Sequence, residues 1–438
     1  MDTNGPKKIL PQSVFRNIRP AYHFILALLA CLRFWYPSRR LTVIGVTGTN
    51  GKSTVVDLLH AILAESGAPT ASISSLRFRI NTMEARNMLK MTMPGRFTLQ
   101  RFLHDAARAR CRYAVVEVTS EGIKQSRHRF IRFAGAVLTN VTPEHIEAHG
   151  GFEPYVREKI KLFARAKGFL IVNGDDKNAK RFLGVSEKMK YAYTPACITV
   201  EKAGAFERIP IHELLVSPEG ISFRVGDTTI TSKLIGQFNV YNILAAVSVA
   251  HALGIHPDVI KKALLRLPGI PGRMEFVQRV PFAVVVDYAH TPDALLNVYK
   301  ALEHYPRRVC VLGAAGGGRD RWKRPEMGRI AAGFCDEIIL TNEDPYDENP
   351  EAILGEIEKG FSSNEKFQRP HGEKIPDRRE AIRAALQRAK PGDVVIITGK
   401  GAEPWMMGPE GTKIPWDDRA TAREQLEKSV TKDVHLGR

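Results

Sequence analysis

The stretch 43–54 constrains this chain more than any other, because it combines a buried strand, a glycine loop and the start of a helix. An apolar run ends in a loop bracketed by Gly48 and Gly51, Lys52 and Ser53 come next, and an apolar-periodic segment follows. The backbone N–H groups of such a loop, with the positive end of the helix behind it, cradle a polyphosphate. Lys52 would reach the terminal phosphates, and Ser53 would offer its hydroxyl to Mg²⁺. The stretch therefore predicts a strand, a phosphate loop and a helix.

The loop differs from the usual phosphate loop in its spacing. Four residues normally separate the two glycines, whereas the pair that fits best here is Gly48 and Gly51. A surface turn before an ordinary helix is the alternative interpretation, but lysine and hydroxyl residues stand where phosphate binding needs them. The predicted nucleotide contacts of the loop are Gly48, Thr49, Asn50, Gly51, Lys52, Ser53 and Thr54.

Composition limits the class of protein. At 438 residues the chain is long enough for two or three domains, and a hydrophobic content of 44% is that of a globular protein. The net charge of +17 permits contact with nucleic acid or with anionic lipid. The basic residues are scattered and no basic-aromatic repeat appears, so we predict no nucleic-acid partner. A net positive charge is also compatible with an enzyme whose substrates are phosphorylated and carboxylated small molecules.

The cysteines predict neither a zinc knuckle nor a redox motif. None of them forms a Cys-x-x-Cys pair, and an odd count is typical of reduced thiols in a cytoplasm. We therefore expect free thiols and a cytoplasmic location. The cysteines are Cys31, Cys111, Cys197, Cys310 and Cys335.

The N-terminal stretch 21–36 is strongly apolar and has Arg16, Arg19, Arg39 and Arg40 on its flanks. A membrane-spanning helix needs about 20 apolar residues, and this stretch is shorter. No small-residue cleavage site follows, which argues against a signal peptide. Two interpretations stay open: a helix packed on the nucleotide-binding domain, or a helix that lies on the membrane surface with aromatic and arginine anchors.

Short apolar runs alternate with helical patterns along the rest of the chain, which predicts an α/β fold with a parallel sheet. The stretch 191–234 instead alternates with turn pairs and predicts a small antiparallel element, and a helix is expected over 242–252. A hinge at 268–272 precedes a second series of strands. The predicted strands lie at 114–118, 135–139, 168–172, 283–286, 309–312, 337–340 and 394–397.

These patterns predict a P-loop-containing central domain with a parallel sheet and a C-terminal Rossmann-like α/β domain. The expected boundaries are 1–40 for the apolar helix segment, 41–274 for the central ATP-binding domain and 275–438 for the C-terminal domain.

Glu117 ends a run that is typical of a buried strand. A carboxylate at the carboxyl end of a strand, beside a phosphate loop, is well placed to hold Mg²⁺. On this segment alone, a capping or solvated glutamate is the alternative.

The loop sequence Gly-Thr-Asn-Gly-Lys-Ser-Thr resembles that of the Mur ligases, a family of ATP-dependent amide-forming enzymes, and further motifs agree in the family's order from about Leu41 onward. The segment 139–159 is similar to one in which a histidine helps bind a second magnesium and a lysine is carbamylated. Lys161 is a second candidate for that lysine, but two residues along a helix its side chain would point in another direction from that of Lys159. The resemblance implies a metal site made of Ser53, Glu117, His145 and Lys159.

The resemblance also implies nucleotide contacts outside the loop. In the family, asparagines equivalent to Asn239 and Asn242 approach the nucleotide, Arg273 would contact phosphate, Asp287 would face the ribose and His290 the nucleotide. A helix cap at Asn239 and a hinge ion pair at Arg273 are the alternatives. The expected catalytic residues are Lys52, Glu117, His145, Lys159 and Arg273.

The segment 287–295 and the glycine run 313–318 are most similar to the subgroup that adds the third residue of the peptidoglycan stem peptide, the UDP-N-acetylmuramoyl-tripeptide synthetases. The resemblance implies an acceptor like UDP-MurNAc-dipeptide, held near Thr92. Arg319 is expected to pair with the carboxylate of the incoming amino acid through its planar fork. The expected substrate-binding residues are Thr92, Pro94, Thr119, Ser120, Arg319, Glu343, Asp344, Tyr346, Gly399 and Glu403.

Two departures from the family pattern affect the expected substrates. Diaminopimelate-adding members carry Asp-Asn-Pro-Arg where this chain has Glu343-Asp344-Pro345-Tyr346, so lysine or another diamine stands beside diaminopimelate as the expected amino acid. Family members usually begin with a separate UDP-binding domain, whereas here the first nucleotide-binding strand already begins near Leu41. The acceptor is therefore expected either to be held differently or to carry a lipid in place of UDP.

The expected reaction is a two-step ligation that uses ATP and Mg²⁺, carried out by a monomer on small-molecule substrates. A related ligase acting on folate or on a non-murein peptide is one alternative, although the segment 287–295 weighs against folate. A non-catalytic nucleotide-binding partner is another, and the joint presence of Lys52, Glu117, His145 and Lys159 weighs against it.

Overall fold

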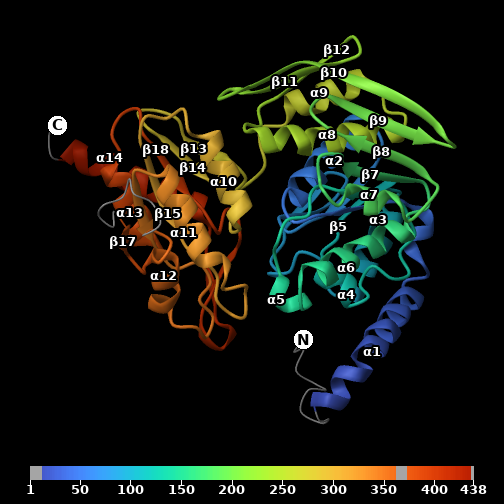
Figure 1. Ribbon diagram of the computed structural model, residues 1–438, viewed down its shortest axis with the longest axis horizontal. Coiled ribbons are helices and arrows are strands. Elements are labelled where there is room, and N and C mark those ends of the chain that lie inside the picture. The colour runs from blue at the N-terminus through green and yellow to red at the C-terminus, as the bar shows by residue number, and fades with distance from the viewer. Residues whose placement is uncertain (1–11, 362–371, 436–438) are drawn as a thin grey trace.

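The computed structural model describes residues 12–361 and 372–435. Two α/β units follow one another along the chain and lie side by side (Figure 1). We call residues 42–266 the central unit, which is built on a 12-stranded sheet, and residues 275–435 the C-terminal unit, which is built on a 6-stranded sheet.

Parallel strands form the middle of the central sheet, in the order β2-β5-β1-β6-β7-β8. They are short runs rich in Val, Ile, Leu and Ala, which is typical of strands that are covered on both faces. The bounds are β1 (Thr42–Thr47), β2 (Thr70–Ile73), β5 (Tyr113–Glu117), β6 (Phe133–Leu138), β7 (Phe169–Asn173) and β8 (Met189–Tyr193).

Antiparallel strands extend the predicted parallel strands at both ends, so the central sheet as a whole is mixed. The antiparallel element expected over 191–234 is present and continues the sheet beyond β8, whereas the hairpin at the other edge has no counterpart in the sequence prediction. The added strands are β3 (Arg77–Ile80), β4 (Met83–Arg86), β9 (Cys197–Lys202), β10 (Ala205–Ser217), β11 (Gly220–Val225) and β12 (Thr228–Ser232).

Successive side chains of the central strands point to opposite faces and so build two cores. Ile44 and Val46 pack in the core under α2, α8 and α9, while Val43 packs in the core under α3 and α6. Helix α8 begins at Gln237, earlier than the predicted 242. The helices are α2 (Lys52–Glu65), α3 (Arg96–Arg108), α4 (Ser120–Lys124), α5 (Ile146–His149), α6 (Phe152–Arg165), α7 (Ala179–Leu183), α8 (Gln237–Ala252) and α9 (Pro257–Arg266).

The C-terminal sheet has the order β13-β14-β18-β15-β16-β17, and only β13 runs antiparallel to its neighbour. Its strands are β13 (Glu275–Gln278), β14 (Ala283–Val286), β15 (Arg308–Leu312), β16 (Glu337–Leu340), β17 (Gly372–Lys374) and β18 (Val394–Ile397). Residues from α10 to α12 pack on one face and residues from α13 and α14 on the other. The helices are α10 (Pro292–Ala301), α11 (Lys323–Phe334), α12 (Pro350–Glu358), α13 (Arg378–Arg388) and α14 (Asp418–His435). A small ribbon of β19 (Trp405–Met407) and β20 (Lys413–Pro415) completes the unit.

The apolar N-terminal stretch forms α1 (Gln12–Arg33), which leans against α3 and is followed by a short 3-10 turn, η1 (Pro37–Arg40). In Figure 1 the N-terminal end of α1 projects from the body of the central unit. Within the part of the chain that is described, no helix is long and apolar enough to cross a bilayer.

Two cysteines depart from the expectation of free thiols. Cys310 and Cys335 are joined by a disulfide between β15 and the residue that follows α11, and their Cα atoms are 6.1 Å apart. The pair is 25 residues apart in sequence, so the spacing gives no signal of it. Cys31, Cys111 and Cys197 are buried free thiols, as expected.

Candidate active site

The phosphate loop joins β1 to α2 in a conformation that requires glycine. Gly51 has φ of 81°, and a Cβ there would stand 2.2 Å from the side-chain oxygen of Asn242. A Cβ on Gly48 would stand 1.8 Å from the hydroxyl of Thr139. The loop is therefore a tight backbone cradle at the positive end of α2, which is the arrangement that binds phosphate groups.

Lys52 is the first residue of α2, and its ammonium group donates to the carbonyl of Thr49 at 2.8 Å. Burial lowers the pKa of Lys52, although the nearby Glu117 carboxylate acts in the opposite direction. A half-buried ammonium group at the positive end of a helix gives the loop a positive character.

A cavity of about 690 Å³ lies where the two units meet, and residues of both line it. Most of the predicted site residues face this cavity. Those that line it are Thr49, Asn50, Gly51, Lys52, Ser53, Thr54, Thr92, Glu117, Thr119, Ser120, His145, Asn242, Arg273, Asp287, His290, Arg319, Glu343, Asp344 and Glu403.

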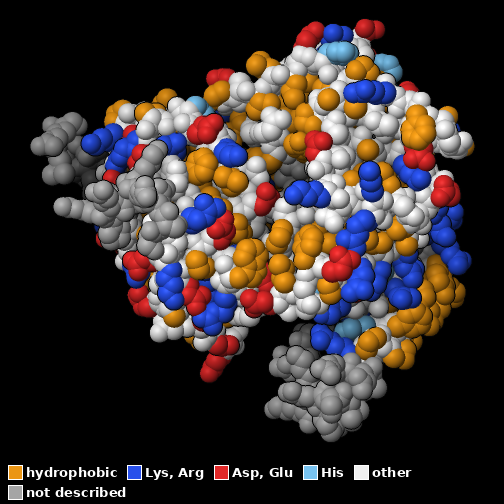
Figure 2. Space-filling model, in the orientation of Figure 1, with side chains coloured by type: hydrophobic (Ala, Val, Ile, Leu, Met, Phe, Trp, Pro, Cys, Tyr) orange, Lys and Arg blue, Asp and Glu red, His pale blue; other side chains and the backbone are white. Residues whose placement is uncertain are grey.

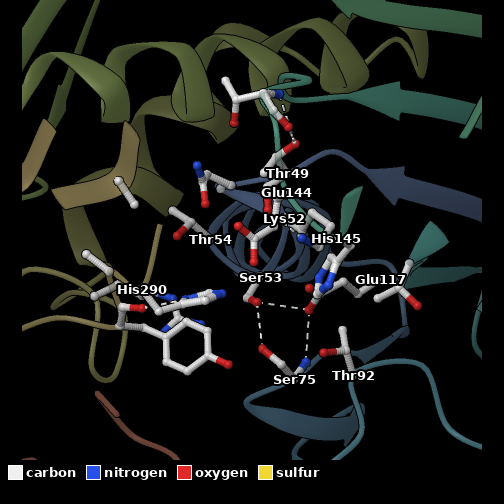
Figure 3. Close-up of a pocket in the computed structure, with 18 of the residues that line it drawn as sticks. Thr49, Lys52, Ser53, Thr54, Ser75, Thr92, Glu117, Glu144, His145 and His290 are labelled. Atoms are coloured by element: carbon white, nitrogen blue, oxygen red, sulfur yellow. Dashed lines mark hydrogen bonds between the residues drawn. The ribbon is translucent and has the colours of Figure 1, made fainter. Parts of the chain in front are cut away.

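Ser53, Ser75 and Glu117 form a triangle of hydrogen bonds at the floor of the cavity (Figure 3). The Ser53 hydroxyl donates to Oε2 of Glu117 at 2.9 Å, and the same oxygen accepts from the backbone N–H of Ser75 at 2.9 Å. A carboxylate and hydroxyls are hard oxygen donors of the kind that Mg²⁺ prefers. The donor set beside the phosphate loop thus fits magnesium. No motif in the sequence marked Ser75.

Lys159 lies inside α6, and its side chain is fully buried. Its ammonium group donates to the carbonyl of Gly48 at 2.7 Å and lies 4.4 Å from the ring centre of Tyr155. Burial lowers the pKa of Lys159 well below its ordinary value, and Lys52 lowers it further. Lys161, the competing candidate, is exposed and pairs with Glu158. Of the two lysines, Lys159 is therefore the one that points to the phosphate loop.

His145 directly precedes α5 and adopts the left-handed backbone conformation, with φ of 57°. Burial, reinforced by Arg319 and His290, lowers its pKa to about 2. The imidazole is consequently neutral and keeps a free lone pair, which is the form that binds metal ions. The ring lines the same cavity as Glu117 and Lys52 (Figure 3). The described residues contain no group of three or more His, Cys, Asp or Glu in metal-binding geometry, so the predicted site depends on the serine hydroxyl and the lysine as well.

Asn239 does not reach the cavity, although the resemblance placed it at the nucleotide. Its side chain donates to the carbonyl of Ile235 at 2.8 Å and accepts from the amide of Asn242 at 2.9 Å. Its amide is thus used by Ile235, just before α8, and its oxygen by Asn242 within α8, so Asn239 positions Asn242, which does line the cavity.

Asp287 and Arg273 lie where the chain enters the C-terminal unit. The Asp287 carboxylate accepts from the backbone N–H groups of Met274 and Ala289, each at 2.7 Å. The Arg273 guanidinium stacks 4.1 Å from the ring centre of Tyr288. Both side chains are thus held in fixed orientations at the rim of the cavity.

Four charged side chains cluster on the C-terminal side of the cavity. Lys400 donates to Asp344 at 2.9 Å and to Glu403 at 2.6 Å, and Lys90 from the central unit pairs with the same two carboxylates. Burial alone would raise the pKa of Glu403, but Lys400 and Lys90 bring it down to about 2. No sequence signal marked Lys90, because it lies in a methionine-rich loop without a motif.

The remaining predicted substrate residues lie at the edges of this cavity or behind it. The hydroxyl of Thr119 accepts from the N–H of Gly122 at 3.1 Å and so caps α4. Pro94, Tyr346 and Gly399 do not line the cavity. A Cβ at Gly399 would stand 2.5 Å from Glu343, so this glycine leaves room for that glutamate.

Hydrogen bonds connect the two units around the cavity. The amide of Asn50 in the phosphate loop donates to Asp293 at 3.0 Å. Asp320 accepts from the backbone N–H groups of Ile146 and Glu147, each at 3.1 Å, and so caps α5 from the other unit. The cavity therefore has the form of a closed cleft.

Comparisons with known proteins agree with this arrangement. Residues 46–250 match the Mur ligase middle domain, and residues 272–401 match the Mur ligase, glutamate ligase domain. The chain is 40% identical to UDP-N-acetylmuramoyl-L-alanyl-D-glutamate–2,6-diaminopimelate ligase of Gloeobacter violaceus, over 92% of this chain and 80% of that protein. It is 37% identical to UDP-N-acetylmuramyl-tripeptide synthetase of Roseiflexus sp., over 93% of this chain and 82% of the relative.

Solved structures show the same fold. A UDP-N-acetylmuramoyl-L-alanyl-D-glutamate–2,6-diaminopimelate ligase superposes with a TM-score of 0.59 at 28% identity, covering 94% of this chain and 83% of that one. The folylpolyglutamate synthase of Mycobacterium tuberculosis superposes with a TM-score of 0.68 at 16% identity, covering 88% and 94% of the two chains. Together with the sequence matches, these likenesses show that the chain belongs to the Mur ligase family, the ATP-dependent acid–amino-acid ligases of peptidoglycan biosynthesis.

Proposed function

We propose that the protein adds an amino acid to the free carboxylate of an acceptor like UDP-MurNAc-dipeptide, in the cytoplasm and as a monomer. The observation that carries the proposal is the shared cavity, in which the phosphate loop of the central unit faces the Asp344–Glu403 cluster of the C-terminal unit. The relatives named for the addition of 2,6-diaminopimelate support the same reaction.

In the first step the acceptor carboxylate oxygen attacks the γ-phosphorus of ATP, the bond to the β-phosphate oxygen breaks, and ADP leaves. Lys52 and Arg273 hold the phosphates and offset the negative charge that develops on them. Ser53, Glu117, His145 and a carbamylated Lys159 would hold Mg²⁺, which neutralises phosphate charge when it is bound.

Carbamylation of Lys159 has a chemical basis in its surroundings. A carbamate forms when a neutral amine attacks CO₂ and then loses a proton, so the lysine must first be deprotonated. Burial and the neighbouring Lys52 lower the pKa of Lys159 and so favour its neutral form. The modified group would carry a negative charge where an ammonium group is costly.

In the second step the amine attacks the acyl phosphate, phosphate leaves and the nitrogen loses a proton, which forms the amide. We assign the amino acid to the cluster around Asp344 and Glu403, whose carboxylates suit an ammonium group, and to Arg319, which suits a carboxylate. Tyr346 stands where the family arginine would pair with a distal carboxylate, so lysine joins diaminopimelate as a proposed substrate.

A lipid-linked acceptor is the second candidate, and one contact favours it. Arg96, which directly follows the loop 92–95, donates to the His23 ring of α1. The first residue of α3, next to the predicted acceptor loop, therefore contacts the apolar N-terminal helix.

The proposal is tested by ADP release with Mg-ATP, UDP-MurNAc-dipeptide and a panel of amino acids that includes lysine and meso-diaminopimelate, with the product mass determined. We expect turnover with one member of the panel and a product heavier by one amino-acid residue. Turnover only with a lipid-linked acceptor would favour the second candidate. ATP binding without turnover on any acceptor would contradict both.

A further inference from the structure

Helix α1 has its small side chains turned inward and its large apolar side chains turned outward. Ala27, Ala30 and Cys31 are buried against the central unit, and the Cys31 thiol contacts the carbonyl of Phe130. On the other side, a stripe of exposed apolar side chains follows the helical spacing of three and four residues. The stripe consists of Tyr22, Ile25, Leu29 and Leu32, and Trp35 extends it with 82% of its surface exposed.

Arginines flank this stripe, and acids are absent from the same stretch of sequence. Between positions 12 and 40 the chain carries five arginines and no aspartate or glutamate. Arg19, Arg33, Arg39 and Arg40 are exposed, and none of the four forms an ion pair with another described residue. Figure 2 shows hydrophobic side chains gathered at the lower right, over the C-terminal half of α1, with Lys and Arg side chains beside them.

We propose that this stripe docks α1 flat on the surface of a lipid bilayer with anionic headgroups. A surface helix of this kind buries its apolar face at the boundary between headgroups and acyl chains, while its basic residues contact the headgroups. Trp35 and Tyr22 have the amphipathic rings that favour the interface, and arginines can extend their heads towards phosphates. The small-residue face of the helix stays on the protein.

Charge argues against a second copy of the chain as the occupant. A two-fold interface brings the same patch of both copies together. Arg33, Arg39 and Arg40 would then face their own counterparts without an acidic partner on α1. An anionic surface instead complements them.

Docking would also place the predicted acceptor loop near the headgroups, because His23 of α1 is hydrogen-bonded to Arg96, which directly follows that loop. This consequence rests on the proposed function, whereas binding to lipid does not. Membrane binding and ligation can therefore fail independently of each other.

The test is co-sedimentation of the full chain with phosphatidylcholine vesicles, with and without phosphatidylglycerol. The patch variant combines Ile25→Gln, Leu29→Gln, Leu32→Gln and Trp35→Gln, all at exposed positions. The matched control combines Phe206→Gln, Leu265→Gln and Ile414→Gln, which change exposed apolar residues elsewhere. ADP release and light scattering on all three proteins report folding and oligomeric state.

We expect the wild type and the control to bind anionic vesicles, more weakly at high salt, and the patch variant to partition at least about tenfold less. Trp35 fluorescence should shift to the blue on binding, and Trp35→Phe should remove most of that shift. Equal binding by the patch variant, or no binding by the wild type, would overturn the proposal. A wild-type dimer that becomes a monomer in the patch variant would overturn the proposal and would show that the stripe binds a second copy of the chain.

Discussion

Lys323 donates to Glu144 across the boundary between the two units, at 2.9 Å, and both side chains are buried. The same ammonium group donates to the carbonyl of His290 at 2.9 Å. Burial raises the pKa of Glu144 even though Lys323 opposes the shift. An ion pair in this position forms only when the cleft is closed, so it reports closure directly.

Removing one member of this pair should impair closure. Lys323→Met leaves the Glu144 carboxylate buried without a partner, at a cost of about 3 kcal/mol to the closed form. Turnover should fall by about a hundredfold, with little change in the melting temperature of the separate units. The measurements are kcat and the radius of gyration in solution. The double variant Glu144→Gln/Lys323→Met should recover part of the activity, and a double variant as poor as the single one would contradict this account.

Lys52→Ala should abolish ATP-dependent product formation. The half-buried ammonium group at the start of α2 is placed to contact the phosphates, whereas Lys159 reaches the loop from α6 and does not line the cavity. ADP release and ATP binding are the two measurements. Retained turnover would refute the assignment of the phosphate loop.

Lys159→Ala should be inactive, and added short-chain carboxylates should restore part of its activity. The free acid would take the place of the carbamate in the space that the side chain leaves. Lys161→Ala removes an exposed lysine of the same helix and is the matched control, which should keep full activity. Full activity of the Lys159 variant without added acid would exclude the carbamate.

Lys90→Ala should change the selection of the amino acid. It removes one of the two ammonium groups that neutralise Asp344 and Glu403, so the carboxylates become available to an ammonium group of the substrate. KM for lysine or diaminopimelate should fall by about tenfold, and KM for norleucine should change little. A rise in KM for all three amino acids would show instead that Lys90 helps to bind them.

Glu343 should make stability depend on pH. Burial, with Asp344 next, raises its pKa to about 7, against 4.5 for the ordinary side chain. The folded protein therefore binds this proton more tightly than the unfolded chain. The resulting stabilisation is fully present at acidic pH below the ordinary value and is lost as the pH rises through about 7. Glu343→Gln should flatten the decline in melting temperature between about pH 5 and 8, while Glu410→Gln, at an exposed site, should leave it unchanged.

Much of this fold could be predicted from local patterns in the sequence. Continuous apolar runs marked the strands of both sheets, because strands covered on two faces have no polar side to interrupt them. Helical periodicity also predicted that Lys159 and Lys161 point in different directions, and in the structure Lys159 reaches the phosphate loop while Lys161 is exposed. These inferences needed only neighbouring residues.

Contacts between distant residues left no such signal. Lys90 and Glu403 are separated by 313 positions, and nothing in the sequence around either residue indicates that the two are in contact. The disulfide of Cys310 and Cys335 depends on the segment after α11 lying beside β15 in space. Asn239 was placed at the nucleotide by analogy, whereas the turn of α8 directs its amide to Ile235.

The cap on α5 has a consequence for when ATP can react. This helix has four residues, too few to be stable alone, and Asp320 of the opposite unit binds the first two N–H groups after His145. Retreat of the C-terminal unit would release those groups and with them the conformation of the histidine. On the proposed mechanism, the site around His145 would be complete only once the C-terminal unit, with the amine that it is proposed to bind, has closed on the central unit, and ATP would be protected from hydrolysis by water until then.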